Sequence, residues 1–132
     1  MTTTAEHYDC LKSEIDSYIT YSRIWMRVWG ATYYSLRTTL IVLSACVAAK
    51  ETLQFVSRNV AAVSLLVAVG TSLDTWLKTG NRFRGHYTFN DKFIALHTDL
   101  ELTNDSDAAA MGRIQDQFKK FIDDYAQAVL PT

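Results

Sequence analysis

Residues that form turns are scarce in this chain: its 132 residues include one proline and five glycines. So few turn formers leave little material for the many tight turns of a β-sandwich or barrel, and they favour a few long helices. We therefore expect an all-α fold. At this length, the size of ordinary domains predicts a single domain over residues 1–132.

Groups that carry chemistry are scarce as well. Cys10 lies in a polar segment and Cys46 in an apolar run, so we expect two reduced thiols rather than a disulfide. Of the three histidines, only His97 has a spaced neighbour, Glu101, and one such pair is weak evidence for a metal. The sequence offers no glycine-rich phosphate loop and no Ser/His/Asp set. We expect no enzyme activity, no cofactor and no metal site.

Net charge and the first residues exclude two further classes. The formal net charge is −1, which points to no nucleic acid partner. The N-terminal residues lack a basic region followed by an apolar core, so we expect no cleaved signal peptide. Charge is instead distributed unevenly, because residues 78–92 are basic and residues 93–132 are acidic. A basic segment directly after an apolar run is typical of membrane proteins.

Two uncharged apolar runs are the most distinctive feature of the sequence. TTLIVLSACVAA (38–49) and VAAVSLLVAVGTSL (60–73) are 12 and 14 residues long. Crossing a hydrocarbon core of about 30 Å takes roughly 20 residues, so neither uncharged run is long enough by itself. With flanking residues that snorkel, 33–49 reaches about 26 Å and 55–77 about 34 Å. Because both runs are apolar on every side, a soluble fold would have to enclose them completely, which few neighbouring helices could do.

Aromatic and basic residues flank the two runs on the same side of a hairpin. Tryptophans precede the first run and follow the second, as in the aromatic belt of a membrane interface. The connecting loop holds only Lys50 and Arg58 as basic residues. The positive-inside rule then predicts that both termini lie in the cytoplasm. The expected interface anchors are Trp25, Trp29, Arg37, Trp76, Lys78, Arg82 and Arg84.

Apolar residues at steps of three and four predict long amphipathic helices around these spans. We expect a helix over 4–50 that runs into a first span at about 33–49. A second span at 55–77 continues as a helix to about 102, and a last helix covers 106–130. The predicted fold is a two-span transmembrane helical hairpin with long amphipathic cytoplasmic helices before and after it. The expected inward-facing residues are Tyr8, Leu11, Ile15, Tyr18, Ser22, Trp25, Trp29, Tyr33 and Leu36, then Leu73, Trp76, Leu77, Gly80, Phe83, Tyr87, Ile94 and Leu100, then Met111, Ile114, Phe118, Phe121, Ile122, Tyr125 and Val129.

Small residues recur at helical spacing in both predicted spans. Such residues let helix backbones approach closely in a membrane. They predict packing within one hairpin or between copies in a homo-oligomer, and a pore lining that includes Thr71 is a further alternative. The residues concerned are Ser44, Ala45, Ala48 and Ala49 in the first span and Ser64, Ala68 and Ser72 in the second.

Charged residues next to the spans have two possible partners. Arg37 and Asp74 fall at the same end of an antiparallel hairpin, where they either pair with each other or reach the headgroups separately. The basic segment 78–86 either contacts anionic lipid headgroups or binds the phosphate of a nucleotide signal.

The order of these elements resembles the SLATT family of two-span bacterial effector domains. The matching segments are YSRIWMR (21–27), SLRTTLIVLSACVAA (35–49) and LDTWLKTGNRFRGHYTFNDKFIALHTDLEL (73–102), within residues 15–103. The resemblance implies an inner-membrane effector of antiphage defence that oligomerises, forms a pore or disrupts the membrane, and causes dormancy or death of the infected cell. Its implied partners are the lipid bilayer and a cyclic-nucleotide synthase or sensor protein from the same operon. It brings no catalytic residues.

Two other functions fit the same sequence. A membrane-anchored scaffold would use the hairpin only as an anchor and its acidic C-terminal region to recruit a cytoplasmic partner. A soluble helical bundle would bury both apolar runs inside the protein or against another chain.

Overall fold

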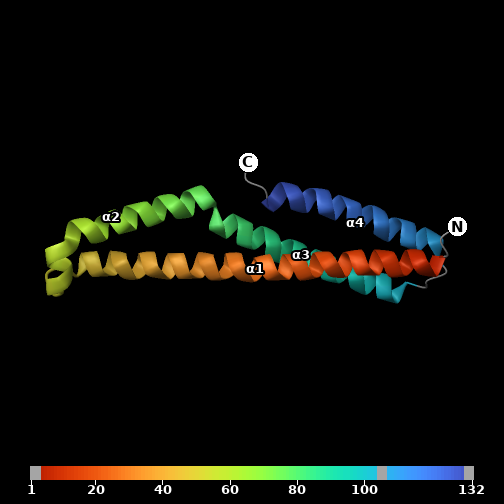
Figure 1. Ribbon diagram of the computed structural model, residues 1–132, viewed down its shortest axis with the longest axis horizontal. Helices are drawn as coiled ribbons and strands as arrows, with labels where there is room; N and C mark the ends of the chain where they lie inside the picture. The colour runs from red at the N-terminus through yellow and green to blue at the C-terminus, as the bar shows by residue number, and fades with distance from the viewer. Residues whose placement is uncertain (1–3, 104–106, 130–132) are drawn as a thin grey trace. The chain divides into compact units, whose positions relative to one another are not determined.

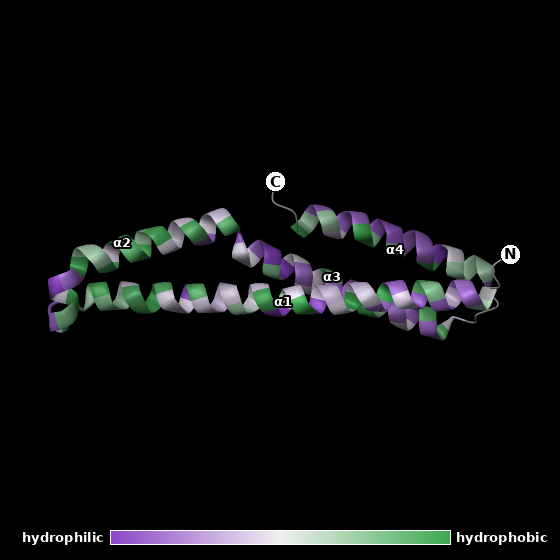
Figure 2. Ribbon diagram, in the orientation of Figure 1, coloured by the Kyte–Doolittle hydropathy of each residue, from purple (hydrophilic) through white to green (hydrophobic). Residues whose placement is uncertain are grey.

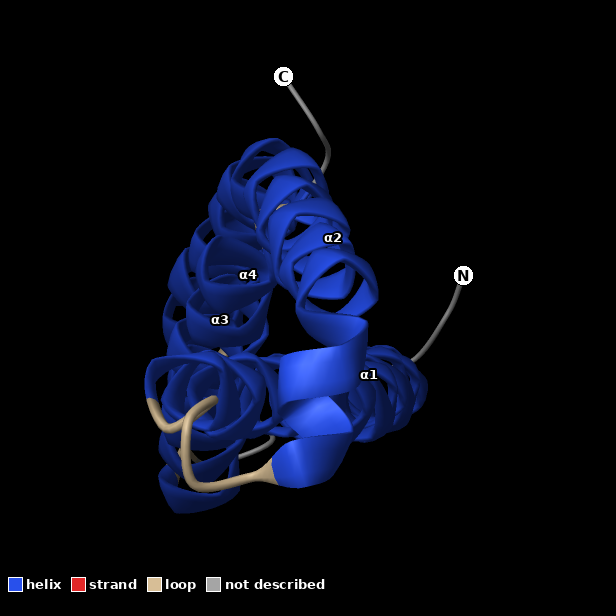
Figure 3. Ribbon diagram, turned by 90° about the vertical axis from the view of Figure 1, so that its left-hand side faces the viewer, coloured by secondary structure: helices blue, strands red, loops and turns tan. Residues whose placement is uncertain are grey.

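In the computed structural model, all regular secondary structure of the described residues, 4–103 and 107–129, is α-helical. Four helices follow one another along the chain (Figure 1), and Figure 3 shows the loop that joins the first two: α1 Thr4–Ala48, α2 Gln54–Leu77, α3 Thr79–Leu102 and α4 Ala108–Val129. The expected fold class is therefore confirmed. The predicted ends of the last helix, 106 and 130, lie outside the described residues.

α1 is one unbroken helix of 45 residues. As predicted, its inward-facing residues recur at steps of three and four, and Leu11 and Ile15 are almost completely buried. Trp25 departs from the prediction, because 37% of its surface is exposed. The next residue, Met26, is half-buried in its place. One residue turns an α-helix by about 100°, so both residues flank the stripe and the packing decides which one faces inward.

α2 and α3 meet at a break. We expected the second span to continue without interruption, but Lys78 has a left-handed backbone (φ 48°, ψ 43°) and ends α2. A left-handed conformation is unfavourable for a residue with a Cβ atom. Asp74 stabilises the break, because its carboxylate accepts a hydrogen bond from the buried hydroxyl of Thr79. Near its start, α2 also bends at Asn59, whose side-chain amide donates to the carbonyl oxygen of Phe55 at 2.9 Å.

The chain divides into two compact units, where the sequence predicted a single domain. The first unit consists of residues 1–27 and 81–132, and the second of residues 28–80. We call the described part of the first unit the bundle and the second unit the hairpin.

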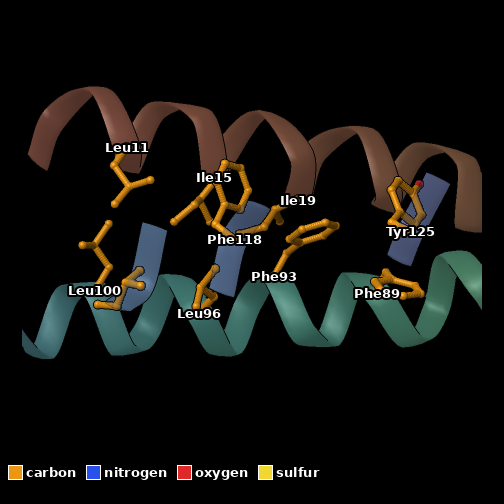
Figure 4. Packing of buried hydrophobic residues seen from close by; sticks show 10 residues of the cluster. Leu11, Ile15, Ile19, Phe89, Phe93, Leu96, Leu100, Phe118 and Tyr125 are labelled. Carbon is orange, nitrogen blue, oxygen red and sulfur yellow. The ribbon is translucent and has the colours of Figure 1, made fainter. Parts of the chain in front are cut away.

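The bundle packs the first part of α1 against α3 and α4 around an aromatic core (Figure 4). Phe93 is completely buried, with its ring centroid 5.5 Å from that of Tyr18 and 6.1 Å from that of Phe118. Asp107 caps α4, because its carboxylate accepts a hydrogen bond from the amide of Ala110 at 2.9 Å. The core consists of Leu11, Ile15, Ile19, Phe89, Phe93, Leu96, Leu100, Ile114, Phe118 and Tyr125.

The prediction for the core of α3 was partly wrong. Leu100 is buried as expected, but Tyr87 is 52% exposed and Ile94 is 39% exposed. The buried positions belong to Phe89 and Phe93 instead. α3 carries apolar residues on two neighbouring stripes, and periodicity alone does not say which stripe its partners cover. For α4 the predicted stripe was correct: Met111, Ile114, Phe118 and Tyr125 are buried, and Phe121, Ile122 and Val129 pack against the core.

In the hairpin, the second part of α1 and α2 run antiparallel, side by side (Figures 1 and 3). The side chain of Leu40 packs closely against α2 at Gly70, where an added Cβ atom would lie 2.7 Å from Cδ2 of Leu40. Only Val56 and Val63 of α2 are buried. The inward-facing positions of α2 again alternate at steps of four and three: Val56, Val60, Val63, Val67, Gly70, Asp74 and Leu77.

Candidate functional site

The outer surface of the hairpin is apolar and exposed (Figure 2). Ile41, Phe55 and Trp76 are 69%, 75% and 77% exposed. Exposed apolar surface on this scale marks a contact with a membrane or with another protein. The other large apolar residues exposed in the hairpin are Val28, Tyr34, Val42, Leu53, Leu65, Leu66, Val69 and Leu73.

Among the described residues, one helical stretch is long and apolar enough to cross a membrane: Gln54–Leu102, which includes α2. Core helices of soluble proteins can meet the same criterion, but they are mostly buried. In this protein, 6% of the most apolar part of that stretch is buried. The first predicted span, within α1, does not meet the criterion, because Arg37 and several hydroxyl side chains reduce its apolar character.

The small residues of both predicted spans point away from the seam of the hairpin. All seven are exposed, so they do not pack α1 against α2: Ser44, Ala45, Ala48, Ala49, Ser64, Ala68 and Ser72. Larger side chains and Gly70 occupy the seam instead. Of the two packing alternatives, only contact with something outside this hairpin remains for these residues.

The exposed surface of α2 after its bend divides into two flanks, given a rotation of about 100° per residue. One flank, which we call the small flank, consists of Ala61, Ser64, Ala68, Thr71, Ser72 and Thr75. The opposite flank, the bulky flank, consists of Ala62, Leu65, Leu66, Val69, Leu73 and Trp76. Bulky apolar side chains suit lipid chains, whereas small side chains suit close helix contacts.

Three of the four hydroxyl groups on the small flank are satisfied by their own helix. Thr71, Ser72 and Thr75 each donate a hydrogen bond to the carbonyl oxygen four residues earlier, at 2.8, 2.9 and 2.9 Å. Thr32 of α1 does the same at 2.9 Å. A polar group that faces hydrocarbon needs an internal partner, because lipid supplies none. These side chains are therefore compatible with a membrane.

Arg37 and Asp74 form an ion pair, with Nε of Arg37 3.6 Å from Oδ2 of Asp74. This contact resolves the two alternatives for these residues in favour of pairing. The guanidinium carbon of Arg37 also lies 5.0 Å from the ring centroid of Tyr33. The carboxylate of Asp74 thus pairs with Arg37 and accepts a hydrogen bond from the hydroxyl of Thr79. The ion pair joins the two helices of the hairpin near the C-terminal end of α2.

The predicted interface anchors are distributed over both units. Trp76 is 77% exposed, Trp29 is half-buried, and Lys78 occupies the break. Trp25 belongs to the bundle and stacks on the imidazole of His86, with centroids 6.4 Å apart. Trp29, Arg37, Trp76 and Lys78 belong to the hairpin, and Trp25, Arg82 and Arg84 belong to the bundle.

The bundle also contains buried polar side chains whose role the sequence did not reveal. Asn90 donates to the hydroxyl oxygen of Ser22 at 2.9 Å and to the carbonyl oxygen of Ile19 at 3.1 Å. This pair fixes α3 against α1 at one register, because a shift would leave buried polar atoms unsatisfied. Ser22 was expected to face inward, but nothing in the sequence marks Asn90 as its partner.

His86 is 1% exposed and lies one helical turn from Asn90. Its Nδ1 atom lies 2.5 Å from the hydroxyl oxygen of Tyr125. Its Nε2 atom is buried without a hydrogen-bond partner in the described structure. Burial, and secondly the charge of Arg82, lower the pKa of His86 below its ordinary value of 6.5. Burial likewise raises the pKa of Tyr125, so both groups stay neutral near pH 7.

Ion pairs connect the first part of α1 with the last part of α3. Lys12 lies 2.9 Å from Glu101, and His97 lies 3.1 Å from Asp16. The hydrogen bond between them raises the pKa of Lys12 and lowers that of Glu101. His97 and Glu101 are neighbours as their spacing suggested, at 3.8 Å, but no cluster of metal-ligating side chains occurs among the described residues. Cys10 and Cys46 are free thiols, as predicted, and Cys10 is exposed.

No protein family, characterised protein or solved structure matches this chain. The chemistry of its surfaces is therefore the basis for a functional proposal.

Proposed function

We propose that this protein is a membrane effector whose hairpin inserts into the bacterial inner membrane, self-associates and permeabilises it. The observation that carries the proposal is the exposed apolar surface of the hairpin, on which Ile41, Phe55 and Trp76 are all more than two-thirds exposed. Water would make such a surface unfavourable by roughly 25 cal/mol for each Å² of apolar area, whereas lipid chains would not. The bundle, which has a buried aromatic core of its own, would remain outside the membrane.

Insertion energies favour a hairpin over separate spans. The apolar residues of α2 contribute roughly −2 to −4 kcal/mol on an insertion scale, which is modest for a helix that also carries Asp74. The first span is less apolar and holds Arg37. Pairing these two charges within one seam lowers the cost of placing either one in the membrane. Both spans would thus enter together, with both termini in the cytoplasm.

Self-association gives the small flank a role. Association of helices in a membrane depends on close packing, because lipid chains are as apolar as leucine. The small flank offers α2 of one copy a surface that another copy can approach closely. The resemblance to the SLATT family adds the physiological setting: abortive infection in antiphage defence, triggered by a nucleotide signal or by a partner sensor from the same operon.

The proposal is tested by expression of the full chain in bacteria together with its neighbouring genes, while a dye reports the membrane potential. Wild-type protein should depolarise the cells and arrest growth. Ala68→Leu fills the middle of the small flank and should reduce depolarisation by about tenfold or more, since it blocks close approach of helices. Ala62→Leu is the matched control, because it adds the same side chain to the bulky flank of the same helix and should have little effect.

Two outcomes would contradict the proposal. Extraction of the wild-type protein into the aqueous fraction by alkaline carbonate would exclude insertion. Equal depolarisation by Ala68→Leu and Ala62→Leu would exclude the small flank as the surface of self-association.

A membrane-anchored scaffold is the second candidate, and the bundle favours it. The bundle has a well-packed core of its own and still exposes Tyr21 and Tyr87, each 52% exposed, as a partner-binding surface would. Removal of residues 104–132 would be a poor test, because α4 contributes Ile114 and Phe118 to the core. An unchanged membrane potential at high expression of a carbonate-resistant protein would favour the scaffold over the pore.

A further inference from the structure

Four arginines lie at the end of the bundle where the chain enters and leaves the hairpin. Arg23 and Arg27 belong to α1, and Arg82 and Arg84 belong to α3. Two contacts set the register of the antiparallel helices, Trp25 with His86 and Ser22 with Asn90. With a rise of 1.5 Å per residue, this register places Arg27 level with Arg84 and the other two within about one turn. We call these four residues the arginine collar.

Charge is strongly divided along the bundle. Residues 21–27 and 81–87 contain the four arginines and no acidic residue. The remaining described parts of α1 and α3 in the bundle, 4–20 and 88–102, contain seven acidic and two basic residues. The bundle therefore has a positive end, next to the hairpin in sequence, and a negative end farther from it.

Exposure and pairing also differ between the two ends. Arg23, Arg27 and Arg84 are exposed, and none forms an ion pair with a described residue. At the negative end, by contrast, Lys12 pairs with Glu101 and His97 with Asp16. On α4, Asp123 and Asp124 precede Tyr125 without pairing to these three arginines. Three guanidinium groups thus remain available for an anionic partner.

Aromatic side chains lie at the same level as the collar. Trp25, Tyr21 and Tyr87 are 37%, 52% and 52% exposed, and the rings of Tyr21 and Trp25 are in contact at 6.1 Å. Amphipathic rings of this kind concentrate at the headgroup level of membranes. A guanidinium group presents a planar set of N–H donors that matches phosphate oxygens. Arginine and aromatic side chains together fit a phospholipid surface better than a soluble anion.

We propose that the arginine collar binds the phosphate groups of anionic phospholipids at the membrane surface. This inference rests on the proposed insertion of the hairpin, since Arg27 directly precedes Val28 and the collar must then lie within a few residues of the membrane. It adds a lipid class to the proposed function: the protein would gather acidic phospholipids around itself and distinguish membranes by their surface charge.

The test uses the full-length protein in vesicles that contain equal amounts of phosphatidylglycerol and phosphatidylcholine. The protein is re-extracted in mild detergent, and the phospholipids that co-purify are quantified. Wild-type protein should be enriched in phosphatidylglycerol. Each basic residue near an anionic surface strengthens binding several-fold, so the double variant Arg27→Gln/Arg84→Gln should lower the enrichment about tenfold or more. High salt should reduce the wild-type enrichment in the same direction, because it screens exposed charges.

A matched control removes the same charge elsewhere on the bundle. Lys119 and Lys120 are exposed on α4, away from the collar in sequence. Lys119→Gln/Lys120→Gln should retain the phosphatidylglycerol enrichment. Equal loss in both double variants would overturn the proposal in favour of a general charge effect, and no loss in either would overturn it directly.

A further arm separates lipid from soluble phosphate. Inorganic phosphate should displace phosphatidylglycerol no better than chloride at equal ionic strength; selective displacement by phosphate would overturn the lipid assignment. Carbonate extraction of the same vesicles tests insertion itself. Release of wild-type protein by carbonate would refute the proposed function, whereas a carbonate-resistant protein without lipid preference would refute only the collar.

Discussion

The bundle and the hairpin share the helix α1, yet they expose different kinds of surface. In both units one stripe of α1 at steps of three and four faces inward. In the bundle, the opposite face is mostly polar and includes Asp9, Ser13 and Asp16, all exposed, together with exposed Ile24. In the hairpin, the opposite face includes Tyr34, Ile41 and Val42, which are also exposed. The inward stripe is therefore common to both units, and the two units differ in the chemistry of the outer face.

The two units also differ in where they place their polar side chains. The bundle buries Ser22, His86 and Asn90 inside an aromatic core. In the hairpin, the exposed hydroxyl groups of Thr71 and Ser72 are satisfied within their own helix, and the carboxylate of Asp74 is turned toward the seam. Water can hydrate an outward polar group, whereas a polar group that faces lipid needs a partner within the protein.

The largest expected effect separates the two units by their cores. Phe93→Ala should destabilise the bundle by about 3–5 kcal/mol, since it removes a completely buried ring from contact with Tyr18 and Phe118. Ile41→Ala, at a 69% exposed position of the hairpin, should change stability by less than about 0.5 kcal/mol. Denaturant unfolding of the full-length protein in detergent micelles measures both. Similar losses for the two variants would mean that the outer face of the hairpin is covered after all.

A smaller effect is expected from the ion pair in the hairpin. Asp74→Asn removes the countercharge of Arg37 and should destabilise the hairpin by about 1–2 kcal/mol, less than a fully buried pair because the Arg37 side chain is 57% exposed. The double variant Arg37→Gln/Asp74→Asn should recover part of this loss, since it leaves no unpaired charge. Hydrogen exchange of the α2 amides in vesicles reports the change. A double variant less stable than Asp74→Asn would show that Arg37 stabilises the hairpin through Tyr33 rather than through Asp74.

Acid should weaken the bundle more than the hairpin, and His86 is the reason. Its folded pKa lies below the ordinary value of 6.5, so below about pH 6.5 the unfolded chain binds a proton that folded His86 does not. Stability is therefore complete above that pH and falls as the pH decreases, by about 1.4 kcal/mol for each unit by which the pKa is lowered.

The measurement is hydrogen exchange of bundle amides at near-neutral and mildly acidic pH. His86→Asn retains a polar atom near the Tyr125 hydroxyl and removes the titrating group, so it should flatten the pH dependence. A pH dependence that survives in His86→Asn would assign the effect to groups other than His86.

The sequence predicted the helices well and their facing surfaces less well. Periodicity identified the stripe of α1 that contains Leu11 and Ile15, since a single helix face there is apolar. α2 carries two stripes at helical spacing, one with Val63 and Val67 and one with Ser64 and Ala68. Only the position of α1 decides which stripe forms the seam. A stripe shows that residues share a face, but a second helix determines whether that face is inside.

Two features could not be predicted from the sequence, because both depend on contacts that form only in the folded structure. The break at Lys78 depends on Asp74 and Thr79, whose hydrogen bond exists only after α2 has ended. His86 gave no distinctive pattern in the sequence, because its importance comes from Tyr125, 39 residues away. By contrast, the proximity of Arg37 and Asp74 could be predicted, because an antiparallel hairpin of two adjacent helices places both residues at about the same height along the helix axes.

The smallest expected effects compare one glycine in each unit. Glycine within a helix is less favourable than alanine by about 1 kcal/mol, so Gly→Ala is stabilising wherever the new methyl group has room. Around Gly112 of α4 an added Cβ atom meets nothing within 4 Å, and Gly112→Ala should stabilise the bundle by about 0.5–1 kcal/mol. At Gly70 the methyl group would displace Leu40, which should cancel most of the gain. Unfolding of both variants in micelles measures the difference, and an equal gain at Gly70 would mean that the seam is looser than its 2.7 Å approach indicates.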